Sequence, residues 1–157
     1  MFIYEKKIID RRIIFYSDTW NNGCYIRESK KPNYAALDVS ELQKLSDEED
    51  SDAQGTLAYY YQEGINVKKD YEKSLELYLK SAENGNTTSM INIAYLYSNG
   101  IGVEQNHKEA FKWNLQAAEN GDPSGMFNVS RKYEFGLGVE RNPEKATYWL
   151  EKSRKEI

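Results

Sequence analysis

The sequence predicts an all-α repeat fold, a right-handed α-solenoid assembled from helical hairpins of 36 residues each. Gly64, Gly100 and Gly136 are the first indication, because they follow one another at intervals of 36 residues. Two further series keep this register, namely Tyr61, Tyr97 and Tyr133 together with Val67, Val103 and Val139. Self-similarity at a fixed period of this length is typical of stacked supersecondary units that pack on their neighbours.

The first helix of each repeat is indicated by an apolar face and by signals at both ends. In the first copy this face comprises Ala53, Leu57, Ala58 and Tyr61. The spacing i, i+4, i+5 and i+8 places these residues on one side of an α-helix. The predicted N-caps are Asp50, Asn86 and Asp122, with Pro123 in the first turn of the third copy. We expect Gly64, Gly100 and Gly136 to end these helices in the left-handed conformation.

The second helix of each repeat follows the same logic. Its predicted N-caps are Asp70, Asn106 and Asn142. Its packing positions hold Ser74, Ala110 and Ala146, then Leu77, Trp113 and Trp149, then Ser81, Ala117 and Ser153. Gly85 and Gly121 close the first two copies, whereas the third ends in polar residues. A polar final helix is what the end of a repeat array requires, because no further unit stacks on it.

The repeats are assigned to residues 50–85, 86–121 and 122–157, within a solenoid that spans 38–157. Residues 38–49 resemble one more second helix, a half repeat with capping-box spacing at Ser40 and Gln43. Residues 37–52 carry one basic and seven acidic residues, a net charge of −6. Two interpretations fit the acidic run at the end of this helix: a solvated linker, or a contact for a basic partner.

Residues 1–37 form a separate N-terminal element. Asn22-Gly23 lies between aromatic and β-branched residues, which predicts a β-hairpin. We expect a small β element that covers the open end of the solenoid. An amphipathic helix through residues 2–16 and a separate contact surface are the alternatives.

Composition and motifs argue against most catalytic and ligand-binding classes. The chain has a net charge of −4. Proteins that bind nucleic acids usually carry a basic stripe, so this charge argues against that class. No apolar run approaches the ~18 residues of a membrane span, and the first residues lack the apolar core of a signal peptide. We therefore expect no nucleic acid or membrane partner and a cytoplasmic location.

The chemistry-bearing residues are sparse. The only histidine, His107, falls in the first turn of a second helix, where we expect an exposed surface residue. One cysteine, Cys24, and one histidine do not make a zinc site or a catalytic pair. Gly100-Ile101-Gly102 follows a helix and lacks the third glycine of a dinucleotide fingerprint. We predict no catalytic, cofactor-binding or metal-binding residues, no cofactor and no enzymatic activity.

The stretch "AENGNTTSMINIAYLYSNGIGVEQNHKEAFKWNLQAAENGD" resembles a Sel1-like repeat, a relative of the tetratricopeptide repeat. The second and third copies match the pattern well. The first copy departs from it at Asn66, Ser74 and Leu77, so we expect looser packing there. Some Sel1-like repeat proteins are described as β-lactamases, but the Ser-x-x-Lys and Lys-Thr-Gly motifs of the serine enzymes are missing from this sequence.

The resemblance implies a protein–protein interaction module. The most specific hypothesis is a bacterial immunity-type protein that binds and neutralises a cognate, basic toxin. The alternative is a signalling or chaperone-like adaptor that holds a peptide or protein in a concave groove. Positions opposite the buried stripe of the first helices give the predicted partner-binding residues: Tyr59, Gln62, Ile91, Tyr95, Phe127, Arg131 and Glu134. Packing against the adjacent repeat explains Ile91 and Phe127 equally well.

Overall fold

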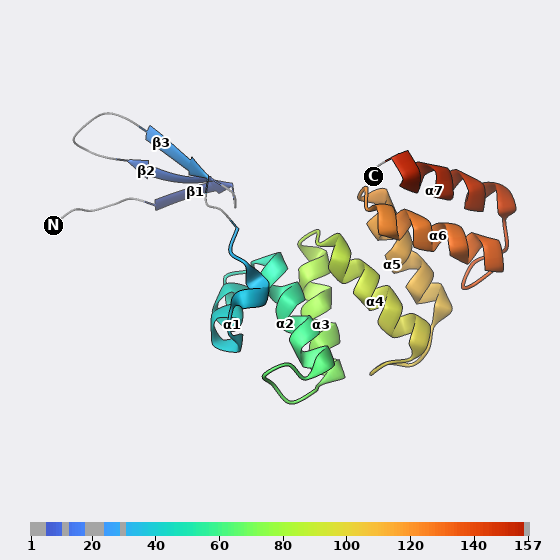
Figure 1. The fold of residues 1–157 in the computed structure, drawn as a ribbon, viewed down its shortest axis with the longest axis horizontal. Helices are drawn as coiled ribbons and strands as arrows, with labels where there is room; N and C mark the ends of the chain where they lie inside the picture. Colours follow the sequence, from blue (N-terminus) through green and yellow to red (C-terminus); the bar gives the residue numbers. More distant parts are fainter. Residues whose placement is uncertain (1–5, 11–12, 18–23, 29–30, 156–157) are drawn as a thin grey trace. The chain divides into compact units, whose positions relative to one another are not determined.

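The computed structural model describes residues 6–10, 13–17, 24–28 and 31–155 (Figure 1). The chain divides into two compact units, residues 1–33 and residues 34–157.

Three antiparallel strands make up the described part of the first unit. They are β1 (Lys6–Asp10), β2 (Ile13–Ser17) and β3 (Cys24–Glu28), in the spatial order β1-β2-β3. The register between β1 and β2 shifts between Ile8 and Asp10. Ser17 pairs with Cys24, so β2 and β3 are consecutive strands of a hairpin. The predicted turn at Asn22-Gly23 lies outside the described residues.

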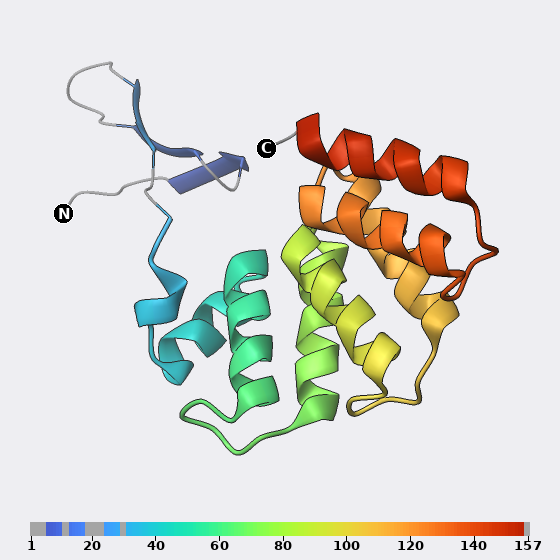
Figure 2. The same ribbon diagram turned by 45° about the vertical axis from the view of Figure 1, so that its right-hand side comes forward.

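The described residues of the second unit form seven α-helices after a short 3-10 helix, η1 (Tyr34–Ala36). The helices are α1 (Val39–Asp47), α2 (Ser51–Glu63), α3 (Tyr71–Glu83), α4 (Thr87–Asn99), α5 (His107–Glu119), α6 (Pro123–Phe135) and α7 (Pro143–Lys155). Three hairpins, α2–α3, α4–α5 and α6–α7, follow one another, and each packs on the next (Figures 1 and 2). The predicted all-α repeat fold is confirmed.

The helices begin where the N-cap residues predicted them to. Asp50, Asn86 and Asp122 each accept hydrogen bonds from backbone amides in the first turn of α2, α4 and α6. The side chains of Asp70, Asn106 and Asn142 do the same for α3, α5 and α7. These bonds satisfy N–H groups that have no partner inside their own helix.

The predicted capping box of α1 was wrong in position. The N-cap is Asp38, whose side chain accepts from Glu41 N at 2.8 Å, while the Glu41 carboxylate accepts from Asp38 N at 3.0 Å. The prediction of Ser40 and Gln43 failed because Asp38 to Glu41 has the same spacing two residues earlier, and an aspartate caps as well as a serine.

Asp50→Ala is expected to lower the free energy of unfolding by about 1–2 kcal/mol. The Asp50 side chain accepts from Asp52 N at 3.0 Å and Ala53 N at 2.9 Å, and also from the Tyr34 hydroxyl at 2.9 Å. Urea denaturation measures the effect. Asp47→Ala is the control, because Asp47 is exposed and accepts only from Gln43 within its own helix. Equal losses in the two variants would contradict the role of the cap.

Most of the predicted packing positions are buried, and the others are half-buried. Leu57, Ile93 and Val129 are fully inaccessible to solvent, as are Ser74 and Ala110 on the second helices. In the first repeat, where the sequence predicts looser packing, Leu77 and Tyr78 are buried, while Trp113 and Trp149 in the later repeats are half-buried. The smaller leucine fits completely beneath its neighbours, whereas the larger indole rings extend to the surface.

The loop between the two helices of a repeat contacts the preceding repeat. At Gly102 (φ 66°) a Cβ atom would lie 2.2 Å from Tyr71 Cβ, and at Gly138 (φ 77°) it would lie 1.9 Å from the carbonyl oxygen of His107. Tyr71 and His107 are the first residues of the second helix in the preceding repeat. The first repeat has Asn66 at this position, with φ 56°. Asparagine tolerates this conformation, and no full repeat precedes it to require glycine.

Candidate partner-binding site

The first helices of the three repeats share an exposed face that carries large aromatic side chains. We call it the first-helix face and define it by Tyr59 on α2, Ile91 and Tyr95 on α4, and Phe127 and Arg131 on α6. Tyr59 is 47% exposed, Tyr95 52% and Phe127 45%. Tyr59 and Tyr95 occupy corresponding positions of successive repeats, whereas Phe127 corresponds to Ile91. Exposed aromatic residues on neighbouring helices are a common property of protein-binding surfaces.

The other predicted partner-binding residues differ from one another in exposure and in contacts. Arg131 and Glu134 are exposed, and the Arg131 guanidinium lies 5.3 Å from the Phe135 ring centre. Ile91 is half-buried and packs partly on the core, whereas Phe127 remains available. Gln62 is half-buried and donates to Glu63 Oε1 at 3.0 Å, which turns its amide toward its own helix end.

Three hollows accompany the first-helix face. One lies between η1, α2 and α4 beside Tyr59, with a volume of about 530 Å³. Another lies between α4, α5 and α6, with a volume of about 260 Å³. A third, of about 370 Å³, lies between α6 and α7 beside Phe127. Each is open to solvent and large enough to receive a side chain of a partner.

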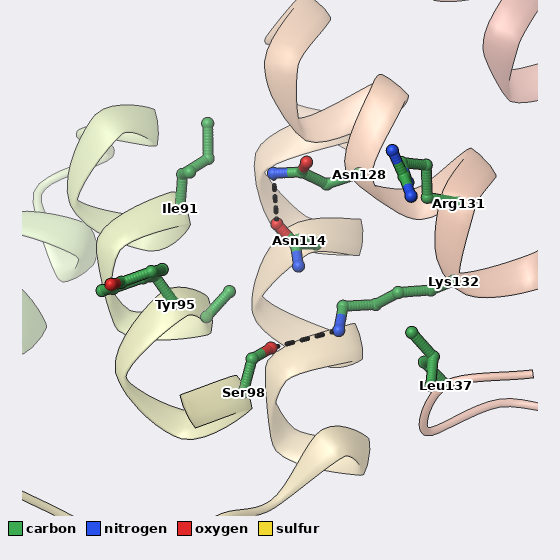
Figure 3. Close-up of a pocket in the computed structure, with 9 residues that line it drawn as sticks. Ile91, Tyr95, Ser98, Asn114, Asn128, Arg131, Lys132 and Leu137 are labelled. Atoms are coloured by element: carbon green, nitrogen blue, oxygen red, sulfur yellow. Dashed lines mark hydrogen bonds between the residues drawn. The ribbon is translucent and has the colours of Figure 1, made fainter. Parts of the chain in front are cut away.

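The hollow between α4, α5 and α6, here called the central pocket, joins three of the predicted residues (Figure 3). Ile91, Tyr95 and Arg131 belong to its lining. The full lining is Ile91, Ala94, Tyr95, Ser98, Asn114, Asn128, Arg131, Lys132 and Leu137. Tyr59, Gln62, Phe127 and Glu134 are not part of it.

Lys132 is an unexpected member of the central pocket. It is only 7% exposed, and its side chain runs from α6 toward α4, where Nζ donates to Ser98 Oγ at 3.2 Å (Figure 3). Burial lowers the pKa of its amino group from the ordinary 10.5. Among the described residues no carboxylate forms an ion pair with it.

Two asparagines form the floor beside this lysine. Asn128 Nδ2 donates to Asn114 Oδ1 at 3.1 Å, and Asn114 Nδ2 donates to the carbonyl oxygen of Ala110 at 3.0 Å. Asn114 is buried on α5. These bonds fix the orientation of both amides, so the polar floor is rigid in its hydrogen-bonding pattern.

Reasoning from the sequence missed Lys132 and Asn114, although the repeat register contains the signal. Lys132 occupies the position of Tyr60 and Leu96 in the earlier repeats, and both of those residues are buried. Asn114 occupies the position of Tyr78, which is fully buried. A polar residue at a position that holds a buried apolar or aromatic residue in an earlier repeat is not needed for the packing of the fold. That comparison, position by position, would have identified both residues.

The acidic run Asp47–Asp50 is partly accounted for by local structure. Asp50 caps α2, and Asp47 and Glu49 line a further hollow together with Lys73 and Lys80 of α3. Asp47, Glu48 and Glu49 are exposed.

The ranges given above contain no group of three or more His, Cys, Asp or Glu residues placed to hold a metal ion. Within the same ranges, no helix has the length and apolar character that crossing a membrane demands. His107 is exposed in the first turn of α5, as predicted.

The sequence matches the Sel1 repeat model three times, at residues 51–86, 87–122 and 123–156. These matches cover more than half of the chain. The chain belongs to the Sel1 repeat family. Sel1 repeats are protein–protein interaction modules, and the family is generally a non-enzymatic scaffold. A comparison with curated proteins found no match.

Solved structures of Sel1 repeat proteins share the fold. A Sel1 repeat protein from Oxalobacter formigenes superposes with a TM-score of 0.72 at 27% identity, over 74% of this chain and 48% of that one. A protective antigen of uropathogenic Escherichia coli strains superposes with a TM-score of 0.73 at 30% identity, over 75% of this chain and 25% of that one. This Sel1 repeat chain therefore spans about half the length of the first protein and a quarter of the length of the second.

A third similar structure supports the fold alone. Cysteine rich protein B of Helicobacter pylori superposes with a TM-score of 0.60 at 18% identity, over 78% of this chain and 92% of that one. The fold is thus shared by two chains of low sequence identity.

Proposed function

We propose that this Sel1 repeat protein binds a protein partner on the first-helix face. The observation that carries the proposal is the set of three exposed aromatic side chains, Tyr59, Tyr95 and Phe127, on successive first helices. Large aromatic residues supply much of the binding energy at protein interfaces, because they bury a large area at a small cost in side-chain entropy. Surface residues of the scaffold without such a role are more often polar.

In its most specific form the proposal is an immunity-type protein that binds a cognate toxin and blocks it, in the cytosol of a bacterial cell. A binding module inhibits by covering the toxin's working surface and needs no chemistry of its own. The exposed acidic residues Asp47, Glu48 and Glu49 favour a toxin with a basic surface, because opposite charges accelerate association.

An adaptor that holds a peptide is the second candidate, and the row of hollows favours it. The three hollows lie beside Tyr59, Tyr95 and Phe127, so an extended segment could place successive side chains in them. An extended ligand needs several small pockets, whereas a folded toxin needs only a complementary surface.

The test is titration calorimetry of the purified chain with the product of the gene next to its own. Tyr95→Ala and Arg131→Glu are each expected to weaken binding about tenfold or more. Tyr148→Ala is the matched control: Tyr148 is an exposed aromatic residue, but it lies on the second helix α7, and its removal is expected to leave the affinity unchanged.

The activity of the partner separates the two candidates. Inhibition of a toxin activity in proportion to complex formation supports the immunity form, and binding without inhibition supports the adaptor. A partner whose affinity is insensitive to Tyr95→Ala and Arg131→Glu would place the binding site elsewhere and overturn the proposal for the first-helix face.

A further inference from the structure

Among the described residues, the buried apolar core of the solenoid falls into two clusters that meet along α5, the second helix of the second repeat. One cluster of buried residues extends from Leu42 to Leu96 and includes Ala117; the other contains Ala118, Met126, Val129, Tyr133 and Ala146. Asn114 on α5 and Lys132 on α6 both line the central pocket. One repeat earlier, the position of Asn114 holds the buried Tyr78 and the position of Lys132 holds the buried Leu96.

The differences at these two positions, relative to the earlier repeats, also explain why the central pocket exists. Asn114 is much smaller than Tyr78, which fills the corresponding position of the first repeat. The side chain of α5 therefore leaves the space between α4 and α6 unfilled. The lysine side chain crosses the space toward Ser98 instead of packing into the core (Figure 3).

The charge of the central pocket is opposite to that of the chain. The chain has a net charge of −4, yet the pocket lining contains two cations, Arg131 and Lys132, and no carboxylate. Lys132 is almost completely buried and makes one neutral hydrogen bond, to Ser98. A buried ammonium group of this kind usually has a carboxylate partner, because desolvation of an unpaired charge is costly.

We propose that the central pocket is a carboxylate-binding site, in which Lys132 and Arg131 receive an acidic group of the partner. This proposal rests on the proposed function and names the chemistry of the partner's contact. The Lys132 ammonium has three N–H donors, of which Ser98 accepts one. No other described residue accepts from it, so the remaining donors can form charge-assisted hydrogen bonds with an incoming carboxylate.

The walls of the pocket suit the methylene groups that carry such a carboxylate. Ile91 and the Tyr95 ring line it from α4, and Leu137 lines the opposite side, near Lys132 (Figure 3). The same chemistry is supplied by an Asp or Glu side chain and by the α-carboxylate at the end of a peptide. Both are acidic groups of a protein, and the experiment separates them.

The test is an NMR titration of the full chain with small carboxylate probes, observing the Lys132 side-chain ammonium and the Asn114 and Asn128 amides. The probes are N-acetyl-glutamate amide, which has a side-chain carboxylate, and N-acetyl-glycine, which has an α-carboxylate. N-acetyl-glutamine amide is the neutral control. For ligands of this size we expect a dissociation constant on the order of 1 mM.

Lys132→Leu is the decisive variant, because leucine is the residue at the corresponding position of the second repeat. Carboxylate binding is expected to weaken about tenfold or more in this variant, read from the Asn114 and Asn128 amides. The matched control is Lys44→Leu, which removes the same charge from an exposed position of α1 and should leave binding unchanged. Preference for one of the two carboxylate probes identifies the source of the acidic group.

Two results would overturn the proposal. One is the absence of saturable shifts in the wild-type chain with either carboxylate, which would mean that the Lys132 ammonium is simply hydrated through the pocket mouth. The other is equal binding to the wild type and Lys132→Leu. Partner binding that depends on Tyr95 and is insensitive to Lys132→Leu would leave the proposed function standing and remove only the carboxylate site.

Discussion

Gly138→Ala is expected to destabilise the protein by about 3 kcal/mol or more, the largest effect of any single substitution considered. A Cβ atom at this position would lie 1.9 Å from the carbonyl oxygen of His107, and the backbone already has φ of 77°. The clash is with backbone, so no rotation of a flexible side chain relieves it. Either the loop or the start of α5 has to move, and the contact between the second and third repeats weakens.

Gly121→Ala is the matched control for this prediction. Gly121 also has a positive φ, of 86°, but a Cβ atom there would meet nothing within 4 Å. Only the conformational strain remains, and we expect a loss of about 1 kcal/mol. Urea denaturation followed by tryptophan fluorescence and by circular dichroism measures both variants. Similar losses in the two would show that the close approach of the loop to His107 contributes nothing.

Lys132→Leu is expected to raise the free energy of unfolding by about 2 kcal/mol at neutral pH, in contrast to most substitutions of buried residues. The ammonium is buried with Ser98 as its hydrogen-bond partner, and leucine would join the two halves of the core. The same substitution is expected to weaken the binding of carboxylates about tenfold or more. A gain in stability together with a loss of binding is the pattern of a residue retained for function at the expense of the fold.

The pH dependence of this effect follows from the direction of the pKa shift. Burial lowers the pKa of Lys132 below the 10.5 of an ordinary lysine, so the unfolded chain binds more protons between the two values. The wild type therefore gains stability as the pH rises through that range, and the advantage of Lys132→Leu shrinks. Tyr95 and Arg131 are the other titratable groups of the pocket lining. Both are present in the wild type and in the variant, so their contributions cancel in the difference in unfolding free energy between the two proteins. An advantage that is constant from pH 7 to alkaline pH would contradict the buried charge.

The repeat fold could be predicted from the sequence because its signals are local and occur three times. Caps such as Asp122 and glycines such as Gly100 act within a few residues of their own helix, and the register of the copies confirms each assignment. The capping box of α1 has no such copy, and there the choice between Asp38 and Ser40 was wrong.

The candidate site was predicted only in part, for a physical reason. Helix periodicity identifies the residues on the far side from the core, and it found Tyr59, Tyr95 and Arg131. Lys132 lies on the buried side, where the same reasoning assumes an apolar residue. The direction that a long side chain takes, here across to Ser98, depends on the packing of α4 and α6 and is not encoded in the spacing along one helix.

The loop contacts give the array of repeats a fixed order. Gly102 and Gly138 accommodate a preceding repeat, whereas Asn66 carries a side chain where such a repeat would press against the backbone. The first repeat therefore accepts a full repeat only on its C-terminal side, whereas the second and third repeats can each follow another repeat. A longer protein would be built by duplicating the second repeat internally, while a shuffled chain with the first repeat in the middle would have to replace Asn66 with glycine before its units could stack.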